Sequence, residues 1–135
     1  RLQKTLLFFL EVDMGTESIQ SERPDASNIR GKFDAYITCF ASGAYKRFEH
    51  VFCSSLNGFR VLLVCNSLGR FRALCRHIAQ WPDSGFVWVT HEQCLHEYGL
   101  GAPIWAPGGR LDVAPQSLLG STMPPKLARQ VPLWQ

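Results

Sequence analysis

Short apolar runs alternate along the chain with segments whose apolar residues recur at helical spacing. Residues 6–10 form an unbroken apolar run that ends in a polar turn, which is the pattern of a strand buried on both faces. Residues 59–65 and 85–90, rich in valine, leucine and aromatic residues, predict two further strands of this kind. Residues 51–53 favour a short strand, and residues 103–106 an edge strand, because Pro103 fits only at an edge.

The intervening segments predict helices. Apolar residues recur three and four positions apart over residues 29–40, with Ser27 or Asn28 as the N-cap and Gly43 as the stop. The same spacing predicts a helix over 68–81, capped by Ser67, and a short helix over 91–98, capped by Thr90. Strand and helix therefore alternate, which predicts an α/β fold with a mostly parallel central sheet flanked by helices.

The composition of the sequence changes after Gly99: six of the eight prolines lie there, and the periodic spacing of apolar residues fades. We expect residues 1–106 to form the folded domain and residues 107–135 to be an extended, irregular tail. Apolar residues in this tail are available to pack on the body or on a second copy, which makes a structural dimerisation domain one possible function: Leu118, Leu119, Leu127, Val131, Leu133 and Trp134.

Composition narrows the class of protein. The chain has 135 residues, of which 46% are hydrophobic and 19% charged, as in a single globular domain with its own core. It contains no run of eighteen apolar residues and no signal-peptide pattern. The first residue is Arg1 rather than methionine, so we expect a fragment of a longer protein. A net charge of +3 permits an anionic partner without demanding one.

Five cysteines, an odd number without a C-x-x-C pair, indicate free thiols in a reducing, cytoplasmic protein. His91, Cys94 and His96 could be combined into a zinc site. However, their spacing matches no closed structural site, and no fourth ligand is evident.

The most informative polar residues follow the first strand. Glu11 and Asp13 are two positions apart, so their carboxylates point to the same side of a strand. Burying charge is costly without a partner, so one interpretation is a site for a divalent metal or a basic group. The alternative is that the strand reaches the surface here and its acids are solvated or cap the next helix.

Other polar residues are predicted at the same carboxyl edge of the sheet, where open α/β sheets bind ligands. They are Thr16 after the first strand, Asn66 and Ser67 after the second, and Thr90 and His91 after the third. Helix capping explains Ser67 and Thr90 equally well. No glycine-rich phosphate loop and no nucleophile elbow are present.

Two basic residues, Arg72 and Arg76, are four apart on the helix predicted over 68–81, with Arg70 nearby. Such a stripe either contacts phosphates or is simply a solvated helix face.

The stretch FFLEVDMGTES, followed by a helix with Lys32 and Tyr36 in K-x-x-x-Y spacing, resembles the replication-relaxation family. The later stretches FRVLLVCNSLGRFRALCRHI and FVWVTHEQCL, and a G-x-P-I-W segment around Trp105, agree with it, so the resemblance covers roughly residues 6–109. It implies a bacterial protein encoded by a plasmid or integrative element. It also implies DNA as the partner and a winged helix-turn-helix domain upstream of the stretch seen here.

The first stretch is also reminiscent of the restriction-endonuclease-like superfamily called PD-(D/E)XK. That resemblance implies a restriction-endonuclease-like fold and catalytic residues Glu11, Asp13 and Lys32, with Glu11 and Asp13 holding Mg²⁺. Asp13 occupies the position where the superfamily has lysine, and Lys32 on the following helix is the replacement. Thr16, Tyr36, Ser67, Arg72 and Arg76 complete the expected site as binding residues.

Together these observations predict a DNA-associated accessory or regulatory domain of a replication-relaxation protein, without catalytic activity. A Mg²⁺-dependent nuclease and a structural dimerisation domain are the alternatives.

Overall fold

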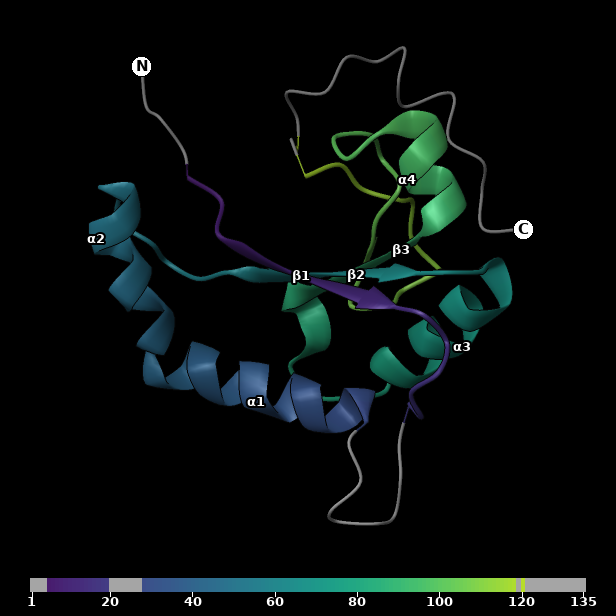
Figure 1. Ribbon diagram of the computed structural model, residues 1–135, viewed down its shortest axis with the longest axis horizontal. Helices are drawn as coiled ribbons and strands as arrows, with labels where there is room; N and C mark the ends of the chain where they lie inside the picture. The colour runs from purple at the N-terminus through teal and green to yellow at the C-terminus, as the bar shows by residue number, and fades with distance from the viewer. Residues whose placement is uncertain (1–4, 20–27, 119, 121–135) are drawn as a thin grey trace.

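The computed structural model describes residues 5–19, 28–118 and 120 (Figure 1). Its centre is a four-stranded sheet whose spatial order follows the sequence. The strands are β1 (Phe8–Asp13), β2 (Arg60–Cys65), β3 (Val87–His91) and β4 (Ala106–Pro107). The first three are parallel, and β4 is antiparallel to β3. The predicted α/β class with a mostly parallel sheet is therefore confirmed.

The helices lie on both faces of this sheet. Helices α1 (Ile29–Ser42) and α3 (Leu68–Ile78) lie below it in Figure 1, and α4 (Glu92–Tyr98) lies above it. A 3₁₀ turn, η1 (Ala44–Arg47), links α1 to the short helix α2 (Phe48–Phe52), and a second turn, η2 (Ser84–Phe86), precedes β3. None of the helices in the described residues is long and apolar enough to cross a bilayer.

Local sequence signals explain most of the helix boundaries. The Asn28 side chain accepts a hydrogen bond from the Gly31 N–H at 2.8 Å, and Gly43 ends α1 with a φ of 73°. The Ser67 hydroxyl accepts a hydrogen bond from the Arg70 N–H at 3.2 Å, which caps α3. These caps confirm the predicted boundaries of both helices to within a few residues.

Three local predictions were wrong. Residues 51–53 belong to the end of α2 and the turn after it instead of forming a strand. The N-cap of α4 is His91 rather than Thr90. Thr90 belongs to β3, and its side chain is completely buried. Strand β1 is not buried on both faces, because its even-numbered side chains are exposed.

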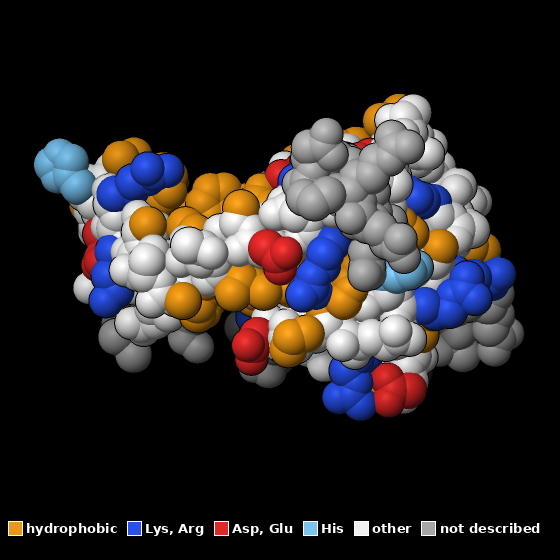
Figure 2. All heavy atoms as spheres, turned by 90° about the horizontal axis from the view of Figure 1, so that it is seen from below, with side chains coloured by type: hydrophobic (Ala, Val, Ile, Leu, Met, Phe, Trp, Pro, Cys, Tyr) orange, Lys and Arg blue, Asp and Glu red, His pale blue; other side chains and the backbone are white. Residues whose placement is uncertain are grey.

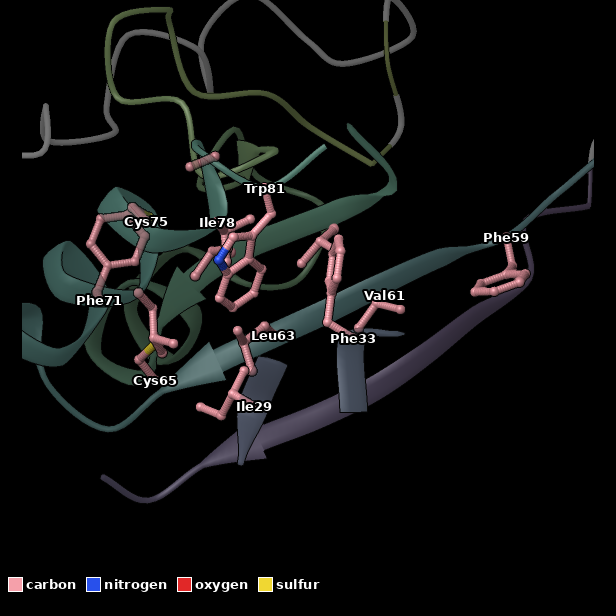
Figure 3. Packing of buried hydrophobic residues seen from close by; sticks show 14 of the residues in the cluster. Ile29, Phe33, Phe59, Val61, Leu63, Cys65, Phe71, Cys75, Ile78 and Trp81 are labelled. Atoms are coloured by element: carbon pink, nitrogen blue, oxygen red, sulfur yellow. The ribbon is translucent and has the colours of Figure 1, made fainter. Parts of the chain in front are cut away.

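Two apolar clusters fill the space on either side of the sheet. The larger joins α1 and α3 to odd-numbered residues of β2, and Figure 3 shows Ile29 and Phe33 beside Val61 and Leu63 in this cluster. The smaller lies under α4 and includes Leu62, Val64, Trp88, Ile104 and the fully buried Trp105. All five cysteines are free thiols.

The segment after β4 returns to the body of the molecule. The Gly108 N–H donates to the Val87 carbonyl at 2.7 Å, and Trp105 and Gln116 form an isolated antiparallel bridge. Ser117 is buried, and Leu118 packs against the cluster under α4. The other apolar residues predicted to pack from the tail all lie outside the described residues: Leu119, Leu127, Val131, Leu133 and Trp134.

Candidate functional site

The carboxyl end of β1 carries Glu11 and Asp13 on the same side of the strand, facing α1. Together with Lys32 and Tyr36 of α1 and with Glu17 of the following turn, they line one pocket. This arrangement confirms that both acids point to one side. The predicted lysine also lies at the same pocket rather than on the far face of its helix.

The pocket has an apolar floor and a charged rim. Its floor is formed by the packed side chains of β2, α1, the end of α3 and the turn after α3, among them Phe33, Leu63 and Trp81 (Figure 3). The free space inside is only about 40 Å³, which is room for a few water molecules.

Asp13 is held by Arg70, which reaches it from the first turn of α3. The Arg70 Nε lies 2.7 Å from Oδ2 of Asp13, and Nη2 lies 3.1 Å from Oδ1. Arg70 Nη2 also donates to the Glu17 carbonyl oxygen. Because Asp13 is only 6% exposed, this bidentate pair is the compensation that a buried carboxylate needs. Hydrogen bonding to Asp13 raises the pKa of Arg70.

Glu11 is engaged by Tyr36, whose hydroxyl donates to its carboxylate. Burial, followed by this hydrogen bond and the Glu11 charge, raises the pKa of Tyr36 above its ordinary value of 10.0. The tyrosine therefore remains a neutral donor in the physiological range.

Lys32 forms an ion pair with Glu17, a residue that the sequence analysis did not place in the site. The Lys32 ammonium lies 2.9 Å from Glu17 Oε2. The hydrogen bond to Glu17 is the main cause that raises the pKa of Lys32, with smaller contributions from Glu11 and Asp13. The Lys32 ammonium therefore interacts electrostatically with all three carboxylates, and of the three it forms an ion pair with Glu17.

The remaining predicted binding residues do not line this pocket. Thr16 is exposed on the turn after β1, and the Ser67 hydroxyl serves as the cap of α3. Arg72 and Arg76 are exposed on α3. Figure 2, a view from the side on which α1 lies, shows lysine and arginine side chains spread over this face rather than gathered in one patch.

Two residues were missed as site residues: Glu17, which lines the pocket, and Arg70, which binds Asp13. Glu17 is part of the E-V-D-x-G-T-E-S motif, so the motif itself was the available signal. Arg70 follows the Ser67 cap by three positions, which puts it in the first turn of α3 at the carboxyl edge of the sheet. Its pairing with Asp13 depends on the parallel register that aligns Asp13 with Cys65, the last residue of β2.

The carboxylates of the rim do not fit a magnesium site. In the described part of the chain, no three His, Cys, Asp or Glu side chains come together as a metal would require. Both Asp13 oxygens are bound to Arg70, and Glu11 is bound to Tyr36. His91 and Cys94 contact each other, with Nε2 and Sγ 3.2 Å apart, but have no third ligand within the described residues.

Comparison of the chain with protein-family models, with curated proteins and with solved structures found no match.

Proposed function

We propose that this chain is a non-catalytic domain of a replication-relaxation protein that contacts DNA. The absence of catalysis is inferred from the hydrogen bonds and ion pairs of three carboxylates at and just after the end of β1. Asp13, Glu11 and Glu17 are each bound by a donor of the chain itself: Arg70, Tyr36 and Lys32. A nuclease of the PD-(D/E)XK kind needs such oxygens free for a divalent cation.

The DNA contact is assigned to α3. Arg72 and Arg76 are exposed and one helical turn apart on this helix, so their guanidinium groups can follow neighbouring phosphates. Arg70, in the first turn of the same helix, is paired with Asp13, and its side chain is only 17% exposed. The DNA contact is therefore assigned to the two arginines that are exposed.

Fluorescence anisotropy with labelled duplex DNA tests this assignment. We expect the chain to bind DNA with an affinity that falls with salt. Replacing Arg72 and Arg76 with alanine should reduce the slope of log K against log salt by about two, because each phosphate contact contributes about one. Lys46→Ala is the matched control, because this exposed cation lies in η1 between α1 and α2. An unchanged slope in the double variant, or no binding by the wild type, would contradict the proposal.

One observation favours a Mg²⁺-dependent nuclease as a second candidate. Glu11, Asp13 and Lys32, the predicted catalytic residues, line one pocket at the carboxyl end of β1. The pairing of these carboxylates does not fit a metal, so we derive no catalytic step for this candidate.

A further inference from the structure

Among the described residues, no element covers the face of β1 that points toward the α4 side of the sheet, and its side chains are exposed. On the neighbouring strand Leu62 is fully buried, whereas its register partner Leu10 is 55% exposed. The cluster packed under α4 includes side chains of β2 and β3 but, among the described residues, none of β1. The result is a row of exposed apolar side chains, here called the open stripe: Leu6, Phe8, Leu10, Val12 and Met14.

A row of this kind is unusual for a free sheet edge. Natural edge strands are normally protected by charged side chains or proline. The two charges of β1, Glu11 and Asp13, point to the opposite face and are bound there by Tyr36 and Arg70. The open stripe therefore carries no charge of its own.

The backbone of β1 is also available for pairing. The carbonyl groups of Leu7 and Asp13 accept hydrogen bonds from the N–H groups of Arg60 and Asn66, at 3.0 and 3.1 Å. Odd-numbered residues thus direct their backbone groups toward β2, so Phe8, Leu10 and Val12 direct theirs outward. Within the described residues β1 pairs with no strand other than β2.

We propose that this edge is the contact between two copies of the chain, which pair β1 with β1 in antiparallel orientation about a two-fold axis at Leu10. Leu10 then faces its own copy, Phe8 faces Val12, and Leu6 faces Met14. Each of the three central pairs exchanges two backbone hydrogen bonds, because both groups of each residue point outward. The sheets of two copies become one continuous sheet, and the two open stripes lie side by side.

The pairing of stripe residues and the placement of the charges together select this register. With the axis at Leu10, every residue of the open stripe faces another residue of the stripe, and Glu11 lies opposite Phe9. An axis at Glu11 would place two carboxylates directly opposite each other, and an axis at Val12 would place Glu11 opposite Asp13. Like charges directly opposite each other destabilise a strand pair. A second copy is therefore the occupant that this edge fits.

Sedimentation equilibrium of the chain at increasing concentration tests the proposal. We expect a monomer–dimer equilibrium that Leu10→Lys weakens by about tenfold or more, because it puts two ammonium groups side by side at the axis. Val51→Lys is the matched control, since Val51 is an apolar residue on α2 that is at least as exposed as Leu10, and its dimer should be unchanged. A monomer at all concentrations, or equal weakening by both variants, would overturn the proposal.

A cross-linking experiment tests the register and does not depend on the folding of Leu10→Lys. Directly opposed residues of a hydrogen-bonded pair have Cα atoms about 5.5 Å apart, which a disulfide spans. Leu10→Cys should give a covalent dimer on mild oxidation, whereas Val12→Cys, which faces Phe8, should give much less. Equal yields would contradict the register. Dimerisation that appears only after truncation at residue 120 would assign the stripe to the chain's own C-terminal segment and overturn the proposal.

Discussion

Asp13 is the residue on which the carboxyl edge of the sheet depends. It is the last residue of β1, it is buried, and both of its oxygens are bound by Arg70. This pair links β1 to the first turn of α3, which is 57 positions away in the sequence. Its role in the described structure is therefore to join two elements.

Removing the arginine should show this role. Arg70→Ala leaves a buried carboxylate without a cation and should lower the free energy of unfolding by about 3–5 kcal/mol. The exposed Arg76 of the same helix is the matched control, and Arg76→Ala should change stability by less than about 0.5 kcal/mol. Urea unfolding followed by circular dichroism measures both. Equal effects of the two substitutions would mean that the Asp13 pair contributes no more than a surface charge.

Tyr36 makes stability depend on pH at the alkaline end. Its folded pKa is raised, so the unfolded chain releases the proton near pH 10 while the folded chain retains it. The free energy of unfolding should therefore fall as pH rises above about 10. Tyr36→Phe should make this fall shallower by up to about 1.4 kcal/mol per pH unit. Burial also raises the pKa of Cys75, to about 12, but that contribution is common to both proteins and cancels. Parallel slopes in urea titrations would contradict the assignment.

At the scale of elements, the sequence predicted what local chemistry controls. The caps at Asn28 and Ser67 and the left-handed Gly43 fix the ends of α1 and α3, and each of these signals can be read from neighbouring residues. The paired acids were also accessible, because the two-residue period of a strand determines that Glu11 and Asp13 share a side.

Local sequence signals could not predict which faces of a strand are covered by elements distant in the sequence. The run at residues 6–10 is as apolar as β2, yet β1 is an edge strand whose even-numbered face no described helix covers. Similarly, the aromatic residues and valine of Phe48–Phe52 favour a strand by propensity, but the segment continues from η1 as a helical turn. Composition alone did not determine the neighbours of either segment.

The whole molecule depends on the close approach of the segment after β4 to α3. Gly109 has a φ of 69°, and a Cβ atom there would lie 2.7 Å from the Cys75 carbonyl oxygen. Gly43 has a similar φ, of 73°, but a Cβ atom there would meet only the flexible Lys46 side chain, at 4.0 Å. The two glycines therefore separate the cost of the backbone conformation from the cost of the contact.

Alanine at each position measures these two costs. Gly43→Ala should lower the free energy of unfolding by about 1–2 kcal/mol through backbone strain alone. Gly109→Ala should cost about 1–3 kcal/mol more, because the added methyl group displaces the segment from α3. Chemical denaturation of both variants gives the difference. If Gly109→Ala were no worse than Gly43→Ala, the segment would not be packed on α3 in solution.

The proposed non-catalytic role requires that the carboxylates at the end of β1 are bound by the chain's own donors instead of a metal. The most direct test is the nicking of supercoiled plasmid DNA in Mg²⁺ by the wild type, with Glu11→Ala and Asp13→Ala as references. We expect the wild type to convert no more plasmid than either variant. Mg²⁺-dependent nicking by the wild type that both substitutions abolish would contradict the account and establish the nuclease alternative.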